Sequence, residues 1–463
     1  MPLSPTNYYG SGLEQGYWGL MIVTYPFISG LVAGSFVVAT LSQLFGRKRL
    51  APLAPIAAIL SFALLLAAPL TIWGDARQPS RVYELITRMH VPWSPMALFL
   101  LIWISYVVLM LVELYAVFRA GNAARAEWAG RPLRAKIAGV LTLGVKGRDA
   151  GSLRRDERIV RWTAGIGILI AFLFHGYIGF IFGSMKSRAL WSSPLIPVLF
   201  IVSAIVSGIA LVEIAYFAIA KWNGWKIDKA IVSELNLWLI GALLLDFYLD
   251  MVELLMSGVR AYAPEETYEW FSRLYFHGPL FWTYFLFQLG LGVVLPLIAL
   301  ATRRWRASIV NSGVMALLVL MGVYMMRWNV VAGGQMASKV TNDIVSFPLV
   351  WTGYDSVQTV LGVFGVAFLL FLLFAWILPW KSGFDAARGT SLLPGAAGPA
   401  GAASSVQPTP DVAGALAKTA DVGSLSSPSS VSSPGLEARA THRLARVRAA
   451  HHAAGVPVTS RGA

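Results

Sequence analysis

The sequence predicts an all-α integral membrane protein, a bundle of about nine transmembrane helices followed by a disordered C-terminal tail. Hydrophobic residues make up 57% of the 463 residues and charged residues only 13%, whereas a soluble domain carries about 25% charged residues. The charged residues cluster in short spacers between apolar runs of about 20 residues or more, the length that crosses roughly 30 Å of hydrocarbon. Because no water satisfies the backbone there, such runs must be helices.

The apolar runs place the individual helices, with bounds that are uncertain by about two to four residues. Trp and Tyr residues mark many of the ends, as in an interfacial aromatic belt. The expected helices are Tyr17–Phe45, Pro52–Trp73, Met96–Phe118, Arg161–Ser184, Pro194–Ala220, Ile231–Met256, Gly278–Thr302, Ala307–Met326 and Ser356–Leu378.

Lysine and arginine residues in the connecting segments predict the orientation. One set of connections carries 20 of them and the alternate set nine. Because the richer set stays in the cytoplasm, we expect the N-terminus outside and the C-terminus inside the cytoplasmic membrane. The net charge of +14 then reflects cytoplasmic loops and the tail, and does not indicate a nucleic-acid partner. The richer set is Arg47, Lys48, Arg49, the eleven basic residues from Arg119 to Arg161, Lys221, Lys226, Lys229, Arg303, Arg304 and Arg306.

Three segments follow from this pattern. Residues 1–16 form an outer N-terminal segment without Lys or Arg, which lacks the features of a cleavable signal. Residues 17–380 form the transmembrane domain. Residues 381–463 are rich in Ala, Gly, Ser and Pro, so they cannot bury enough apolar surface to fold and are expected to be a disordered cytoplasmic tail. Within it, Leu436–Ala454 is either a basic helix that touches anionic lipid or simply solvated.

Ionisable residues inside the apolar runs are candidates for function, because a charge there costs about 2.5–3.5 kcal/mol. Asp246, Asp250 and Glu253 share one face of their helix. With Asp75 and Arg327 at the outer ends of the second and eighth helices, the candidates are expected to form a polar file from the cytoplasm to an outer pocket. The six candidates inside the runs are Glu113, His175, Glu213, Asp246, Asp250 and Glu253.

Structural alternatives compete with this interpretation. The glutamates near helix ends could reach the interface by snorkelling, the aspartates could form salt bridges with a neighbouring helix, and His175 could be a hydrogen-bonded core residue. Gly30 and Gly34 give the first helix a small face for close packing.

The residue types limit the possible cofactors. The chain has no cysteine, which excludes disulfides, Cys-ligated iron–sulfur clusters and thiol catalysis within it. A membrane b-type haem normally takes two histidines from within the bundle, and His175 is the only deep one. His90 and His277 are expected at the outer surface, and the other three lie in the tail, so we expect no haem.

Several short motifs occur in an order and spacing typical of a known family. They include Tyr17-Trp18-Gly19 and Ser29-Gly30-Leu31-Val32-Ala33-Gly34 in the first helix, Asp75-Ala76-Arg77-Gln78-Pro79 after the second, His175-Gly176 in the fourth, and Arg327-Trp328-Asn329-Val330-Val331 at the end of the eighth. With these motifs, from about Tyr17 to Trp380, the chain resembles the NrfD/PsrC family of polysulfide reductase membrane subunits, and within it the HybB-like branch. The family usually has Leu-Gly-Arg-Pro after the aspartate, and the branch often has an additional N-terminal helix; this sequence departs from both patterns.

The resemblance implies a membrane-anchoring subunit without a redox cofactor of its own. Such subunits bind menaquinone or ubiquinone as substrate near the outer face, where a ferredoxin-like iron–sulfur subunit docks and exchanges electrons with a catalytic subunit, often a molybdopterin enzyme. Carried over to this sequence, His175, Asp75 and Arg327 are expected at the quinone with Asp250 or Glu253 nearby. Asp246, Glu213 and Glu113 would form a proton route to the cytoplasm. A proton-coupled secondary transporter that uses the same carboxylates is the alternative from another class, and a purely structural anchor is a third.

Overall fold

A computed structural model describes residues 18–381, apart from residues 77, 92, 129–131 and 339–342. The chain divides into two units, Met1–Ser405 and Val406–Ala463, and all of the described residues belong to the first. The expectations for residues 1–16 and for the tail, including Leu436–Ala454, fall outside the described residues and stay predictions.

The described residues are almost entirely helical, and an isolated β-bridge joins Ala337 and Ile344. In chain order the elements are α2 (Leu20–Leu44), the 3₁₀-helix η2 (Lys48–Leu53), α3 (Ala54–Ala67), α4 (Pro69–Asp75), the 3₁₀-helix η3 (Pro79–Arg81), α5 (Glu84–Thr87), α6 (Pro95–Ala126), α7 (Pro132–Leu141), α8 (Ala150–Gly183), α9 (Ile196–Trp222), α10 (Lys229–Gly258), α11 (Glu265–Phe271), the π-helices η4 (Ser272–Phe276) and η5 (Trp282–Val294), α12 (Leu295–Ala301), α13 (Arg303–Arg306), α14 (Ile309–Met336) and α15 (Val357–Ile377).

Eight helical segments of the described chain are long and apolar enough to cross a membrane, which confirms a multi-pass, all-α membrane protein. The ninth expected helix is present as α10, which has 30 residues. It is not one of those eight segments, and it carries Asp246, Asp250 and Glu253 in its C-terminal half. The eight segments are α2, Lys48–Asp75, α6, α8, α9, Trp282–Ala301, α14 and α15.

Two helices extend well beyond their expected bounds. The helix expected at Arg161 begins at Ala150, where Asp149 caps its first turn by accepting from two backbone amides. The helix expected to end at Met326 continues to Met336, because the residues after Met326 are mostly apolar or small and stay buried. Arg327 is therefore inside α14 and fully buried, and the expectation that it sits at a helix end is wrong.

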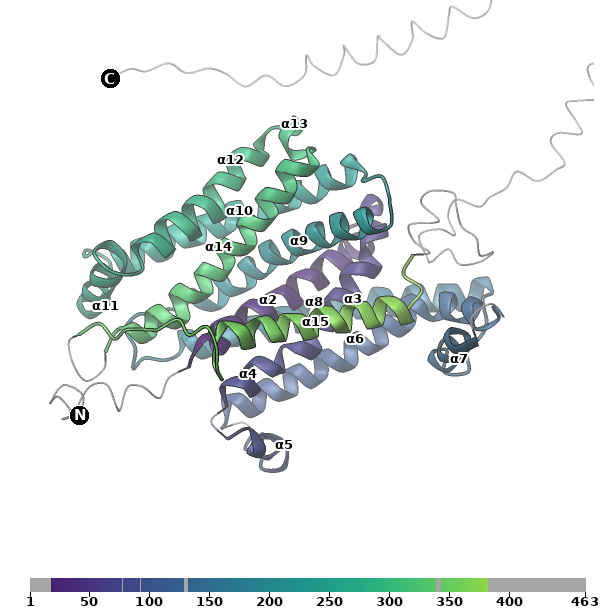
Figure 1. Ribbon diagram of the computed structural model, residues 1–463, viewed down its shortest axis with the longest axis horizontal. Helices are drawn as coiled ribbons and strands as arrows, with labels where there is room; N and C mark the ends of the chain where they lie inside the picture. Colours follow the sequence, from purple (N-terminus) through teal and green to yellow (C-terminus); the bar gives the residue numbers. More distant parts are fainter. Residues whose placement is uncertain (1–17, 77, 92, 129–131, 339–342, 382–463) are drawn as a thin grey trace, which may run out of the picture. The chain divides into compact units, whose positions relative to one another are not determined.

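Helix α2 lies at the centre of the packing. It contacts α3, α8, α9 and α14, and Figure 1 shows it among these helices. Gly34 of α2 and Gly208 of α9 meet so closely that a Cβ atom on either would overlap the other helix's backbone. The expected small face of the first helix is therefore confirmed at Gly34, while Gly30 lies against the His175 ring.

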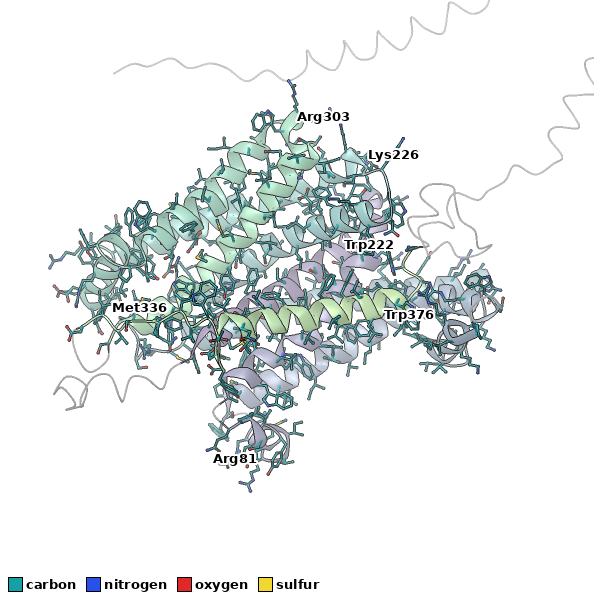
Figure 2. All side chains as sticks on the ribbon, in the orientation of Figure 1. Arg81, Trp222, Lys226, Arg303, Met336 and Trp376 are labelled. Atoms are coloured by element: carbon teal, nitrogen blue, oxygen red, sulfur yellow. The ribbon has the colours of Figure 1, made fainter. Side chains whose placement is uncertain are left out.

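The connections gather basic residues toward one end of the helices. In Figure 2, Arg303, Lys226 and Trp222 lie toward one end and Met336 toward the other. We call the first the basic end and the second the opposite end. Helices α2, α9 and α14 each run between these two ends. The position of a residue along its helix therefore tells how far it lies from the basic end and from the opposite end.

Candidate functional site

The fully buried side chains of His175 on α8 and Arg327 on α14 contact each other. The Arg327 Nη2 atom lies 3.1 Å from His175 Nε2 and donates to Ser203 Oγ at 2.6 Å. The guanidinium lies over the Phe200 ring at 3.9 Å, and the His175 imidazole stacks on the same ring. On the other side, His175 Nδ1 lies 3.2 Å from Ser29 Oγ of α2. Four helices thus meet at this His175–Arg327 pair.

The hydrogen-bond partners of His175 indicate which of its two ring nitrogens carries the hydrogen. A guanidinium can only donate, so His175 Nε2 accepts from Arg327 and carries no hydrogen. The ring hydrogen of the neutral imidazole is then on Nδ1 and donates to Ser29 Oγ. The Ser29 hydroxyl in turn donates to the Tyr25 carbonyl at 2.9 Å. His175 is therefore a hydrogen-bonded core residue in this state, and it is also in direct contact with a cation.

Arg327 is a buried cation that lacks a close anion. Among the described residues, no carboxylate lies within ion-pair distance of it, and its Nε atom has no hydrogen-bond partner. Its charge does interact over a longer distance with Asp246 and Asp250 of α10. Because a buried charge is costly unless it is compensated, these two aspartates are the natural source of the compensating charge.

Asp250 begins a chain of hydrogen bonds toward the opposite end. Gln288 Nε2 lies 3.3 Å and 3.4 Å from the two Asp250 carboxylate oxygens. The Gln288 carbonyl oxygen accepts from Asn329 Nδ2 at 2.8 Å, and Thr283 Oγ1 donates to Asn329 Oδ1 at 2.7 Å. One turn before Asp250, the buried Asp246 Oδ1 has no partner among the described residues.

Glu253 lies one turn beyond Asp250 and has its own donors. Ser193 Oγ donates to it at 2.8 Å and Ser257 Oγ at 3.1 Å. The expectation that Asp246, Asp250 and Glu253 share a face is met, but their partners differ, and the salt-bridge alternative for the aspartates does not describe them.

The chain of amides depends on an irregular helix that the sequence did not signal. Gln288 and Thr283 both lie on η5, a π-helix of 13 residues. π-Helical turns are rare and often occur at functional sites. Gln288, Ser203 and the role of Asn329 were not predicted from the sequence, because none of these side chains is ionisable. Gln288 and Asn329 could have been predicted from the sequence, because each is an uncharged amide in an otherwise apolar stretch.

Asp75 lies away from the His175–Arg327 pair. It accepts from the Gly19 backbone amide at 3.1 Å, and Asp355 accepts from Met21 at 2.8 Å. Both aspartates thus meet the N-terminus of α2, where a negative charge is favourable. Gly30, which faces His175, lies further along α2 by about 16 Å at 1.5 Å per residue. The structure therefore does not bring Asp75 into contact with His175.

Glu113 and Glu213 form two further polar clusters nearer the basic end. Thr163 Oγ1 donates to Glu113. Asn236 Nδ2 donates to Glu213 Oε1 at 2.9 Å and also contacts Ser312. Both glutamates are almost fully buried, so the snorkelling alternative does not describe them.

The polar clusters of the expected proton route are separated in this state. On α10, the fully buried Leu239 and Leu243 lie between Asn236 and Asp246. Along α10 this step is about 15 Å. The hydrogen bonds of the described residues therefore do not link Glu213 to Asp246, and the route stays a prediction.

A family model decides the classification. The model of the NrfD polysulphide reductase family matches residues 12–339, which is more than half of the chain. The chain belongs to the NrfD family. The resemblance inferred from the sequence motifs is therefore confirmed, and an NrfD-type membrane anchor accounts for the apolar bundle.

Three relatives are similar over most of this NrfD domain. A selenate reductase subunit of Mesobacillus selenatarsenatis is 28% identical over 69% of this chain and 74% of its own length. A putative dimethyl sulfoxide reductase membrane subunit of Halobacterium salinarum is 28% identical over 65% of each chain. The Hdr-like menaquinol oxidoreductase integral membrane subunit of Archaeoglobus fulgidus is 25% identical over 61% of each. The chain thus spans about two thirds of these relatives.

Proposed function

We propose that this NrfD protein is the quinone-binding membrane subunit of a respiratory oxidoreductase complex in the cytoplasmic membrane. It would exchange electrons between menaquinone or ubiquinone, its substrate, and an iron–sulfur partner subunit. Family membership and a relative named as a menaquinol oxidoreductase subunit support this proposal. The relatives are named as subunits of reductases or of an oxidoreductase, so the transporter alternative gains no support from them.

The observation that carries the proposal is the unpartnered Arg327 Nε beside His175. A quinone carbonyl oxygen is an acceptor that this buried donor lacks, and the imidazole next to it can exchange a proton. Reduction of a quinone to a quinol takes two electrons and two protons. The electrons would come from the proposed iron–sulfur partner. The protons pass through His175 and the neighbouring acids.

Some of the acidic residues would lie beside the quinone, and others would lie farther away along the proton route. Asp250 and Glu253 would flank the quinone and relay protons through hydrogen bonds, and Asp246 and Asp250 would interact electrostatically with Arg327. Asp75, which the family resemblance places at the quinone, would act from the N-terminus of α2. Asp246, Glu213 and Glu113 would conduct protons toward the cytoplasm, a route that requires rearrangement of the apolar layer at Leu239 and Leu243.

The opposite end would hold the partner subunits on the outer side of the membrane. Large apolar side chains are exposed there, with Trp93 88% and Trp351 68% exposed, although Trp222 at the basic end is equally exposed. Exposed apolar surface of this kind marks a contact with protein or lipid. The selenate and dimethyl sulfoxide reductase relatives are named as single subunits, which implies further ones in those proteins. For this chain we propose a ferredoxin-like iron–sulfur subunit bound here, followed by a catalytic subunit, often a molybdopterin enzyme in related complexes.

The test is a His175→Ala variant in the assembled complex. Quinone-linked turnover should be lost, whereas turnover with an artificial dye, which bypasses the membrane, should be kept. His277→Ala is the matched control, because His277 is exposed, and it should retain both activities. If the His175→Ala complex assembles and turns over quinone at a near wild-type rate, His175 is only a core residue and the assignment fails.

A further inference from the structure

The described part of the segment between α6 and α8 exposes several apolar side chains. Trp128, Leu133, Val140 and Leu143 are each more than half exposed, with Leu143 at 74%. Leu133 and Val140 lie seven residues apart on α7 and therefore share a face. The exposed Lys136, three residues after Leu133 and four before Val140, lies on the same side of α7. An exposed helical face that combines apolar and basic side chains suits a membrane surface rather than bulk water.

Two contacts place these side chains beside two membrane-spanning helices. Tyr115 on the spanning helix α6 donates from its hydroxyl to the Thr142 carbonyl at 3.4 Å, and Thr142 directly precedes Leu143. The guanidinium of Arg134 on α7 lies 4.8 Å from the ring of Trp376 near the end of α15. The exposed apolar side chains therefore lie beside the end of α15 and beside Tyr115, which is one turn before Arg119, the first basic residue after the apolar stretch of α6.

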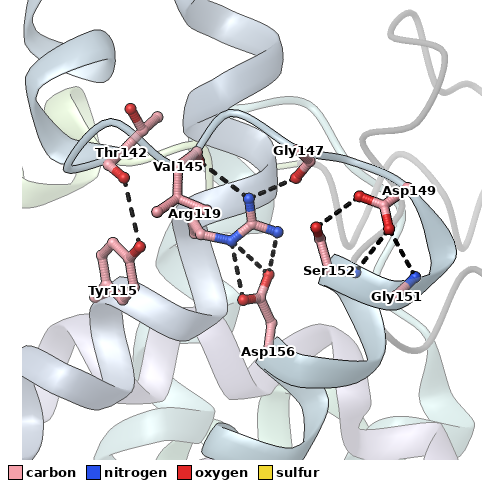
Figure 3. A network of polar contacts seen from close by, with 9 residues as sticks. All are labelled: Tyr115, Arg119, Thr142, Val145, Gly147, Asp149, Gly151, Ser152 and Asp156. Carbon is pink, nitrogen blue, oxygen red and sulfur yellow. Dashed lines mark hydrogen bonds and ion pairs between the residues drawn. The ribbon is translucent and has the colours of Figure 1, made fainter.

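A buried ion pair fixes the turn that carries Leu143. Figure 3 shows the Arg119 guanidinium paired with Asp156 and donating to the carbonyl oxygens of Val145 and Gly147. Those two bonds are 3.1 Å and 2.6 Å long. The turn is therefore pinned to α6 and α8 on both sides of its exposed part.

Leu143 has an unusual conformation for a leucine. Its φ angle is +48°, in the left-handed region that side chains other than glycine rarely adopt. Its side chain is exposed, and the conformation belongs to a tight turn in which the Val145 amide donates to the Thr142 carbonyl at 2.9 Å and Gly144 also has a positive φ. A fixed, exposed leucine is well suited to insertion into lipid.

Basic side chains surround the apolar ones. Lys136 of α7 and Lys146 of the turn are exposed, as are arginines in the first turns of α8. Anionic phospholipids attract such residues near a membrane surface. The combination of apolar and basic groups at this level matches the boundary between acyl chains and anionic headgroups.

We propose that α7 and the turn Thr142–Gly147 form an interfacial anchor at the basic end. Leu133, Val140 and Leu143 insert into the leaflet, and Lys136 and Lys146 bind the headgroups of anionic phospholipids. This anchor is independent of quinone chemistry, so its success or failure does not bear on the proposed function.

Insertion can be measured directly, because the full chain has no cysteine. A spin label on Leu143→Cys is compared, in nanodiscs containing phosphatidylglycerol, with labels on Leu369→Cys and Lys226→Cys. Leu369 is an exposed residue of α15 and reports hydrocarbon, whereas Lys226 is in an exposed turn at the basic end and reports water. The Leu143 label should collide more with oxygen than with a water-soluble nickel chelate, as the Leu369 label does. A label that behaves like the one at Lys226, or that is shielded only when other subunits are bound, overturns the anchor.

Headgroup binding needs a second measurement. Native mass spectrometry from nanodiscs of mixed phosphatidylglycerol and phosphatidylcholine compares the wild-type chain with Lys136→Gln and Lys146→Gln. Each lysine lost should weaken enrichment of the anionic lipid by up to about fivefold. Lys226→Gln is the matched control and should leave enrichment near the wild-type value. Equal enrichment in all variants overturns the assignment of anionic headgroups.

Discussion

At the scale of single residues, the His175–Arg327 pair shows what the sequence could and could not predict. Both residues stand out because an ionisable side chain in an apolar run requires a reason. The family resemblance placed both at one pocket, but their direct contact in the interior was not predicted. Arg327 was expected at a helix end, and the continuation of α14 to Met336 places it in the interior. Ser203 and Gln288 were missed since neither is charged, yet they bind the charged groups directly.

The first prediction concerns Ser203, which accepts from Arg327 at 2.6 Å. Ser203→Ala removes a hydrogen bond to a buried charged group and should lower the free energy of unfolding by about 1.5–3 kcal/mol. Detergent-induced unfolding followed by tryptophan fluorescence measures the change. Ser105→Ala is the control, because the Ser105 hydroxyl is exposed and donates only to Leu101 of its own helix. Equal stability of the two variants would show that the Ser203 bond contributes little.

At the scale of elements, the sites where two helices pack closely were easier to predict than the residues at which helices begin and end. A run of small residues marks a packing face whatever its neighbour, and Gly34 does meet Gly208. Helix ends depend on tertiary context, so α8 and α14 were underestimated. The π-helix η5 could not be predicted, since its apolar sequence resembles that of an ordinary α-helix.

The second prediction concerns the contact between α2 and α9. Gly34→Ala forces a methyl group into the backbone of α9 at Ala204 and Gly208, so the helices must separate. Fluorescence-detected gel filtration should show a large loss of monodisperse protein. Gly362→Ala on α15 is the control, because nothing lies within 4 Å of its Cβ position, and it should behave like the wild-type chain. A monodisperse Gly34→Ala variant of unchanged stability would contradict the close contact.

The third prediction concerns the cap of α8. Hydrogen bonds from the Ser152 hydroxyl and backbone amide lower the pKa of Asp149. A lowered pKa in the folded state means that the carboxylate stabilises the fold above the ordinary aspartate pKa, and that this contribution is lost as the pH falls through the lowered value. Asp149→Ala should therefore reduce the melting temperature at pH 7, and the gap to the wild type should narrow in acid. Asp149→Asn, which keeps an acceptor, should be affected less at pH 7. A gap that is constant with pH would show that the charge of Asp149 is unimportant.

At the scale of the whole molecule, the membrane itself makes the fold predictable. Hydrocarbon thickness fixes the length of each spanning helix, so apolar runs located all of the long helices, including α10. The arrangement of those helices around one another was not predictable, because a helix that is apolar all round does not reveal which face meets which neighbour. That is why the candidate residues could be named while their grouping into separate polar clusters could not.

The last prediction is the orientation, which rests on 20 basic residues in one set of expected connections against nine in the other; of the nine, Arg327 lies inside α14 and no longer counts. Retention of basic loops on the cytoplasmic side should place Lys226 inside the cell. Ile86 of α5, whose side chain is 66% exposed, should then be outside. Because the chain has no cysteine, an impermeant maleimide applied to intact cells should label Ile86→Cys and should leave Lys226→Cys unlabelled until the cells are permeabilised. A reporter fused after Trp380 should likewise give a cytoplasmic signal. The reverse labelling pattern would place the exposed Trp93 and Trp351 in the cytoplasm, and it would move both the proposed partner surface and the lipid anchor to the other side of the membrane.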